Sequence, residues 1–184
     1  MVRRGFLEGD PHELRLIEQI KKGDRNAFES LIGKYSAPLW NYVTFRVRDE
    51  ADAKDVIQET MLAVWQGLAG YEAQSSFKTW AFGVARKKLA DFYRRRAGRG
   101  TLPLEDYEGE YAPDDDFERS VEKLDVDRAR TRLSERDNEL VYLVFQAQLS
   151  YPQVAETLGI PVGTVKSRMS GIKSRLRGLL AGEG

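Results

Sequence analysis

The 184 residues suffice for one ordinary domain or two small ones, each of the latter near the lower size limit for an independent hydrophobic core. Hydrophobic residues make up 41% and charged residues 32%, which are globular values on the charged side and argue against wholesale disorder. No apolar run approaches the roughly 20 residues of a membrane span, and Met1 to Asp10 lacks the pattern of a secretory signal. We therefore expect a cytoplasmic protein without membrane insertion.

The chain is poor in the residues that metal sites and many enzymes use. It has no cysteine and a single histidine, His12, so disulfides, thiolate metal ligands, cysteine nucleophiles and most histidine triads are excluded. A metal-dependent nucleic-acid-processing enzyme would need its carboxylates in a structured cleft. The densest acids instead lie in Thr101 to Asp125, a segment with the composition of a linker. We expect no metal, no cofactor and no catalytic residue.

The net charge of zero conceals a strong polarity along the chain. Between Lys78 and Gly100, eight basic residues face one acid, a local charge of +7. Between Thr101 and Asp125 the sign reverses, since ten acids face two basic residues, a local charge of −8. A basic block is typical of a surface that binds a polyanion, although on charge alone a solvated helix face explains it equally well.

Helical periodicity dominates the chain, and the Val/Ile/Thr alternation of strands is missing. The sequence therefore predicts an all-α protein. The expected helices are, in chain order, Glu13 to Lys22, Arg25 to Arg48, Ala51 to Leu68, Ser76 to Arg96, Arg119 to Arg132, Glu135 to Ala147, Tyr151 to Leu158 and Val162 to Leu180.

A change of composition divides these helices into two groups. Between Ala97 and Phe117 the chain is rich in Gly, Pro and acids, which is typical of a flexible linker. We expect two small helical domains, with the following limits: an N-terminal tail at 1–12, a first domain at 13–96, the acidic linker at 97–118 and a second domain at 119–184.

The helix expected over Ala51 to Leu68 has an unusual outer face. Its inward stripe is predicted to be Ile57, Met61, Val64 and Leu68. Its outward side chains are Asp55, Gln58, Glu59 and Gln66, with Leu62 among them. A single exposed leucine needs no explanation, yet a leucine amid acids and amides also suits a docking face for a basic partner. The residues alone leave both interpretations open.

The helix expected over Ser76 to Arg96 combines an aromatic residue with cations. Its inward side chains are predicted to be Phe77, Ala81, Val84, Ala85 and Phe92. Another row holds Trp80, Lys87, Asp91 and Arg94. Indole can stack on an unpaired base while cations hold phosphates, which is the chemistry that captures single-stranded DNA. Trp80 is explained equally well as a core residue.

The last two helices have the pattern of a DNA reader. Ser150 and Gln153 form a capping box, and Gly159 stands where a left-handed residue ends a helix. The next helix carries one apolar stripe, namely Val165, Met169, Ile172, Leu176 and Leu179. This is the helix-turn-helix arrangement, whose second helix enters the major groove; the alternative is a helical hairpin with a solvated charged face. Lys166 and Ser167 are the best candidates for base contacts.

From about Glu13 to Arg177 the chain resembles the extracytoplasmic-function (ECF) RNA polymerase sigma factors. The segment from Asp52 to Glu59, followed by Trp65, looks like region 2.2 of that family. The resemblance implies docking on the clamp helices of the polymerase β′ subunit, through Asp52, Asp55, Gln58, Glu59 and Leu62.

Two further blocks carry the resemblance. The segment Phe77 to Arg95 is similar to regions 2.3 and 2.4 and implies recognition and melting of the −10 promoter element through Phe77, Lys78, Trp80, Lys87, Asp91 and Arg94. The segment from Leu133 to Arg168 resembles region 4 and implies reading of the −35 element through Thr164, Lys166, Ser167, Arg168, Ser170 and Lys173. The chain departs from the family at Lys87, where Asn is frequent, and at Gly171, where arginine is frequent.

The resemblance implies a sigma factor that directs promoter-specific initiation of transcription, in response to a stress or envelope signal. Its implied partners are core RNA polymerase, through the β′ clamp helices and the β flap, promoter DNA and an anti-sigma factor. The alternative is a stand-alone helix-turn-helix transcription regulator, which would dimerise to read palindromes. The promoter sequence, the regulon and the identity of an anti-sigma factor do not follow from the sequence.

Overall fold

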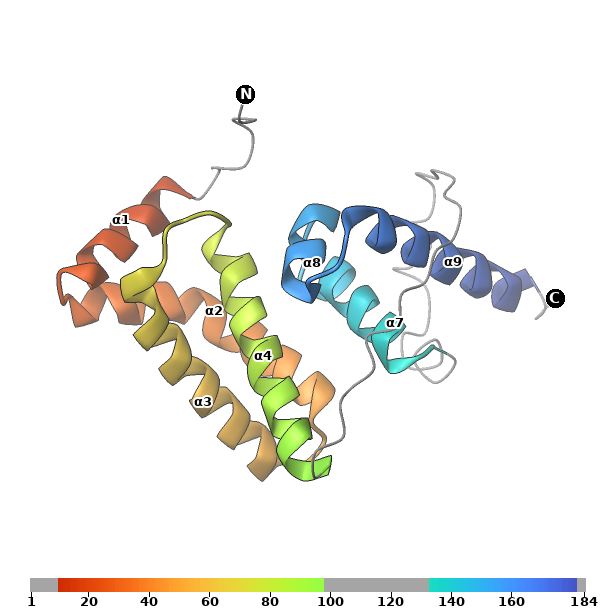
Figure 1. Cartoon of the computed structure of the whole chain (residues 1–184), viewed down its shortest axis with the longest axis horizontal. Coiled ribbons are helices and arrows are strands. Elements are labelled where there is room, and N and C mark those ends of the chain that lie inside the picture. Colours follow the sequence, from red (N-terminus) through yellow and green to blue (C-terminus); the bar gives the residue numbers. More distant parts are fainter. Residues whose placement is uncertain (1–9, 98–132, 182–184) are drawn as a thin grey trace. The chain divides into compact units, whose positions relative to one another are not determined.

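The computed structural model describes residues 10–97 and 133–181, with side chains through Leu176. The chain divides into two compact units, residues 1–103 and 104–184. Within the described residues every regular element is a helix, so the all-α prediction is confirmed (Figure 1). The helix expected over Arg119 to Arg132 and the acidic linker from residue 98 onward lie outside the described residues. The domain limits at the linker therefore stay a prediction.

The first unit contains the helices α1 (Pro11–Lys21), α2 (Arg25–Arg46), α3 (Glu50–Gly67), the short 3-10 turn η1 (Leu68–Gly70) and α4 (Phe77–Ala97). Three aspartates set where the first helices begin, because the side chains of Asp10, Asp24 and Asp49 accept the free backbone N–H groups of the first turns. Gly23 adopts a φ of +94° in the tight turn after α1. Each helix of this unit begins and ends within two residues of its predicted limits.

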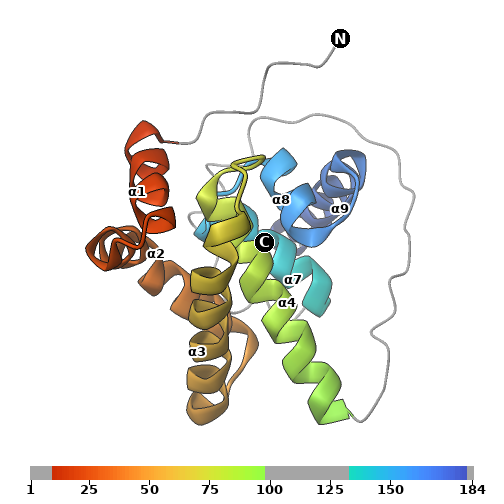
Figure 2. The same ribbon diagram turned by 60° about the vertical axis from the view of Figure 1, so that its left-hand side comes forward.

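The helices of the first unit pack as a bundle. Helix α2 contacts α1, α3 and α4, and Figure 2 shows α3 and α4 running side by side. The core lies between these helices and includes Leu31, Leu39 and Tyr42 of α2, Val64 of α3 and Phe82 of α4. The ring of Tyr42 lies 5.3 Å from that of Phe82, centroid to centroid. This bundle holds the outer faces of α3 and α4 in fixed directions.

The inward faces of α3 and α4 differ in part from the sequence prediction. On α3, Val64 is buried as expected, but Ile57 and Met61 are half-buried, and Val56 and Thr60 face the core instead. Thr60 is tolerated there because its hydroxyl donates to the carbonyl of Val56, at 2.8 Å. On α4 the inward stripe was wrong at two positions, since Val84 and Phe92 are half-buried whereas Phe82 and Leu89 are buried.

The second unit contains α7 (Glu135–Val141), a π-helical turn η3 (Tyr142–Gln146), α8 (Tyr151–Leu158) and α9 (Val162–Ala181). The predicted single helix over Glu135 to Ala147 is thus α-helical only in its first half. Before α8 the capping box forms as predicted, with the backbone N–H of Ser150 donating to the side chain of Gln153 at 2.8 Å. Gly159 ends α8 in the left-handed conformation, with a φ of 68°. Helix α9 packs against both α8 and α7.

Candidate nucleic-acid interface

Helix α9 presents a polar face opposite its buried stripe. Val165, Met169, Ile172 and Leu176 are buried as predicted, and the side chain of Leu179 lies outside the described residues. Of the predicted DNA-reading residues, Lys166 is exposed, and the half-buried members are Thr164, Ser167, Arg168, Ser170 and Lys173. Thr164 to Ser170 lie in the N-terminal half of α9, the part of a recognition helix that contacts bases, and Lys173 lies just past the middle of the helix.

Ser167 and Lys166, neighbours on α9, differ in the hydrogen bonds that they can offer to another molecule. The Ser167 hydroxyl donates to the carbonyl of Thr164, at 3.1 Å, so in this rotamer its oxygen acts toward other groups as an acceptor. Lys166 is exposed, and its ammonium group supplies only donors. The ion pair of Arg175 with Asp137, at 2.7 Å, ties α9 to α7 and supports the orientation of the helix.

The outer side of α4 carries the row that the sequence predicted. Lys87 and Arg94 are exposed, and Trp80 and Asp91 are half-buried. Asp91 forms an ion pair with Arg94 on the same helix. The spacing of these side chains, at seven, four and three residues, places them along one side of α4. This row is basic at its C-terminal end and aromatic at its N-terminal end.

Trp80 lies at the edge of an aromatic cluster. Its ring centroid is 5.1 Å from that of Tyr71 and 5.8 Å from that of Phe77. Gly67, the last residue of α3, provides the space for the indole, because a Cβ atom at this position would lie 2.8 Å from Trp80 Cζ2. Trp80 therefore packs against this cluster and is half-buried, and its role in stacking on an unpaired base stays a prediction.

Phe77 and Lys78 do not lie with this row. Phe77 is 1% exposed and contacts Tyr35 and Tyr71, so its side chain belongs to the core and does not face DNA in this conformation. Lys78 is half-buried. Burial lowers the pKa of its ammonium group, and the nearby Glu13 carboxylate of α1 opposes that shift. The start of α4 is therefore close to α1.

The outer face of α3 is acidic and apolar. Asp55, Gln58 and Leu62 are exposed, with Leu62 at 55%. Asp52 and Glu59 lie on the flank of α3 next to α4, where Asp52 pairs with Arg96, and Glu59 with Arg95 at 2.9 Å. The predicted polymerase-binding set is thus on one side of one helix, but two of its acids already hold cations of α4.

One exposed residue of this face was missed as a candidate. Trp65 is 38% exposed and stands one turn after Leu62, with its ring edge-on to Phe28 of α2 at 4.6 Å. The spacing of three residues from Leu62 was the signal that could have identified it. Together Leu62 and Trp65 form an apolar strip beside the exposed polar groups of α3.

In residues 10–97 and 133–181, no three His, Cys, Asp or Glu side chains are grouped as a metal site would require. In the same part of the chain, no helix combines the length and the apolar character of a membrane span. The acids of Thr101 to Asp125 lie outside these residues.

The first unit is a helical bundle whose helix α4 carries basic and aromatic side chains, and the second unit has the helix-turn-helix arrangement. Together they indicate a DNA-binding protein with two helical domains. Comparisons with known proteins specify the class. Residues 31–99 match the Sigma-70 region 2 family, and residues 123–176 match the Sigma-70 region 4 family. The ECF RNA polymerase sigma factor SigF of Caulobacter vibrioides is 36% identical over 145 residues, which cover 78% of this chain and 80% of SigF.

Solved structures show the same fold. CnrH, in complex with the cytosolic domain of CnrY, matches with a TM-score of 0.67 and 23% identity, over 94% of this chain and 99% of CnrH. The sigma factor RpoE of Bartonella quintana, in complex with the anti-sigma factor NepR, matches with a TM-score of 0.58 and 23% identity, over 83% of this chain and 98% of RpoE.

The chain belongs to the ECF RNA polymerase sigma factors. It directs promoter-specific initiation of transcription, and the stand-alone regulator is not favoured.

Proposed function

We propose that the outer face of α3 is the surface that binds core RNA polymerase, at the clamp helices of β′. The exposed leucine and tryptophan would supply buried apolar area, and Asp55 and Gln58 would supply polar contacts around it. Trp65 joins the predicted set, because tryptophan is enriched among the residues that contribute most to binding at protein interfaces. Asp52 and Glu59 would contribute at the flank of this face. On binding, each would either keep its ion pair with Arg96 or Arg95 or exchange it for a cation of the polymerase.

The outer row of α4 is the proposed site for the −10 element. Trp80 offers a partly exposed indole for an unpaired base, while Lys87 and Arg94 of the same row provide cations for phosphates. Lys78, which lies outside this row, would contact the DNA from the start of α4. Asp91 orients Arg94 through their ion pair. Phe77 acts from the core, by holding the ring of Trp80.

The polar face of α9 is the proposed site for the −35 element. Lys166 can reach base edges in the major groove, where lysine donates to guanine O6 and N7. Thr164, Ser167 and Ser170 are short enough to allow close approach, and Arg168 and Lys173 would contact phosphates. The same unit would contact the β flap of the polymerase.

The mechanism consists of binding steps. The two units link the polymerase to two promoter elements, and capture of an unstacked base on the α4 row offsets the few kcal/mol required to open the duplex locally. Nucleotide polymerisation belongs to the polymerase, so we assign no catalytic residue and no cofactor to this chain. We place the protein in the cytoplasm, where promoter DNA and polymerase are found.

Regulation by an inhibitor protein fits the exposed faces. Leu62 and Trp65 are large apolar side chains in solvent, and the α4 row is basic. RpoE of Bartonella quintana was solved with an anti-sigma factor. By analogy, an anti-sigma factor that covers these faces would keep this chain from polymerase until a signal releases it.

The observation that carries the proposal is the row on α4, where a partly exposed tryptophan and exposed cations share one side of a helix. The test is transcription in vitro with core polymerase, on a promoter library randomised at both elements. Trp80→Ala should reduce opening of duplex promoters, and a pre-melted bubble template should restore activity because it removes the unstacking cost. Lys166→Ala should lose about 1–3 kcal/mol of discrimination at one −35 base pair.

The control for Lys166 is Arg136→Ala, which removes an exposed cation from α7 of the same unit. This variant should keep the −35 preference of the natural chain. Permanganate footprinting of unpaired thymines reports opening directly. If Trp80→Ala opens duplex promoters normally, the proposed −10 site on α4 is wrong. If Lys166→Ala and Arg136→Ala behave alike, the −35 assignment is wrong.

A further inference from the structure

The loop of residues 71–76, between η1 and α4, leads directly into the proposed −10 site. Tyr71 shapes it, because the Tyr71 hydroxyl donates to the carbonyl of Ser75, at 2.5 Å. Ala73 adopts a φ of 55°, in the left-handed region that an alanine rarely occupies. Ser76 closes the loop by accepting the backbone N–H of Thr79 on its hydroxyl, at 3.2 Å. The loop therefore has a defined conformation that its two ends impose.

Lys21, fifty positions earlier in the chain, contacts the first residue of the loop, Tyr71. The ammonium group of Lys21, the last residue of α1, donates to the backbone carbonyl of Tyr71, at 2.5 Å. Tyr71 is 6% exposed, and its ring packs against that of Trp80. A bond at this carbonyl consequently fixes both the start of the loop and the aromatic neighbour of the indole.

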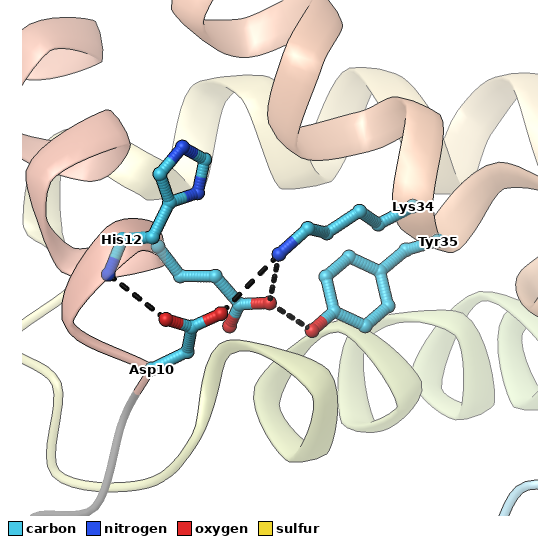
Figure 3. Close-up of polar contacts among 5 residues, drawn as sticks. Asp10, His12, Lys34 and Tyr35 are labelled. Atoms are coloured by element: carbon cyan, nitrogen blue, oxygen red, sulfur yellow. Dashed lines mark hydrogen bonds and ion pairs between the residues drawn. The ribbon is translucent and has the colours of Figure 1, made fainter.

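Helix α1 is anchored by contacts that do not involve Lys21. At its N-terminal end the buried carboxylate of Glu13 accepts the hydroxyl of Tyr35, at 2.5 Å, and lies 3.4 Å from the ammonium of Lys34 (Figure 3). Lys34 also pairs with Asp10, at 3.3 Å. Burial and the Glu13 carboxylate raise the pKa of Tyr35, so this hydroxyl stays a donor at neutral pH.

The apolar side of α1 completes this anchor. Leu16, Ile17 and Ile20 are buried, and α1 packs against both α2 and η1. Loss of the Lys21 side chain should therefore leave α1 docked.

We propose that Lys21 is a positioning residue that sets the conformation of loop 71–76 and the pose of Trp80 for the unpaired −10 strand. This inference rests on the proposed −10 site. Helix α1 lies before residues 31–99, the part matched by the Sigma-70 region 2 family, so the match itself assigns no role to Lys21. The ligand is the unpaired promoter strand, which the loop and the indole meet together.

The test compares Lys21→Met, Lys21→Arg and Lys22→Met in transcription with core polymerase, on promoters with each −10 base varied. Lys22 is the matched control, since it is exposed and its side chain makes no hydrogen bond or ion pair within residues 10–97. Lys21→Met should lower −10 base discrimination and duplex opening about three- to tenfold, as loss of one ordinary hydrogen bond gives. The guanidinium group of Lys21→Arg can donate to the same carbonyl, so this variant should keep most of the natural −10 base discrimination and duplex opening.

Thermal unfolding and the −35 preference separate positioning from folding. The −35 preference should be unchanged in Lys21→Met, and its unfolding temperature should fall by no more than the loss of one hydrogen bond allows. Lys22→Met should match the natural chain in every measurement. If Lys21→Met keeps the natural −10 preference, or if Lys21→Arg fails to restore it, the inference is overturned. Trp80→Ala serves as the reference: if Trp80→Ala also leaves −10 behaviour unchanged, the proposed −10 site fails, whereas a defect in Trp80→Ala alone overturns only the role of Lys21.

Discussion

Gly67 shows how a single residue controls the proposed −10 site. It ends α3 without a side chain, and the indole of Trp80 occupies the space that a Cβ atom would take. In a helix, alanine is ordinarily preferred to glycine by about 1 kcal/mol. At Gly67 we expect the reverse preference, because an added Cβ atom would lie 2.8 Å from Trp80 Cζ2. Tyr71 and Phe77 restrict the directions in which the indole ring could move away.

We predict that Gly67→Ala displaces the Trp80 ring, destabilises the first unit by about 1–3 kcal/mol and slows opening of duplex promoters. Equilibrium unfolding and permanganate footprinting measure the two effects. Gly33→Ala is the control, since a Cβ atom at this helical position of α2 would meet nothing within 4 Å. It should leave opening unchanged. Normal stability together with normal opening in Gly67→Ala would contradict the packing of Trp80 described above.

At the scale of elements, α3 has two functions on adjacent sides. Its inner face closes the bundle, and its flank pairs Asp52 and Glu59 with Arg96 and Arg95 of α4. These ion pairs are partly exposed, so each contributes at most about 1 kcal/mol and is weakened by salt. The side facing solvent, with Asp55 and Leu62, contributes little to packing and is available to a partner.

The double substitution Asp55→Ala with Leu62→Ala should weaken binding to core polymerase while the protein stays folded. Both side chains are exposed, and surface substitutions of this kind change stability by about 0.5 kcal/mol or less. Titration of labelled protein with core polymerase measures the affinity. Glu18→Ala, which removes an exposed acid from α1, should bind normally. An unchanged affinity in the double variant would show that polymerase docks elsewhere.

For the whole molecule, the two proposed DNA sites lie in different units of the chain. The α4 row belongs to the first unit and the α9 face to the second. Residues without shared partners usually make additive contributions to free energy. The two sites should therefore act independently once both are bound to one polymerase.

The double variant Trp80→Ala with Lys166→Ala tests this independence. Its loss of promoter activity should equal the product of the two single losses, within about twofold, as additive free energies require. A bubble template should restore the share due to Trp80 and leave the share due to Lys166. A double variant that is no weaker than the poorer single variant would mean that both residues act on one step.

Much of this protein could be predicted from local sequence patterns. The capping aspartates and Ser150 set helix starts, and the stripe from Val165 to Leu176 set the inner face of α9, because caps and apolar spacing act within a few residues of the chain. The row of Trp80, Lys87, Asp91 and Arg94 followed from the same periodicity. The acidic face of α3 with an outward Leu62 did so as well.

Contacts between distant segments were decided only by the tertiary structure. The burial of Phe77, the seat of Trp80 on Gly67 and the bond from Lys21 to Tyr71 each depend on how α1, α3 and α4 pack. Helical periodicity gives the direction of a side chain around its own axis, but it does not say which neighbour lies in that direction. The sequence by itself therefore determined most of the described helices, the outer faces of α3, α4 and α9, and the family. Packing decided which of the candidate residues are exposed and which support them from within.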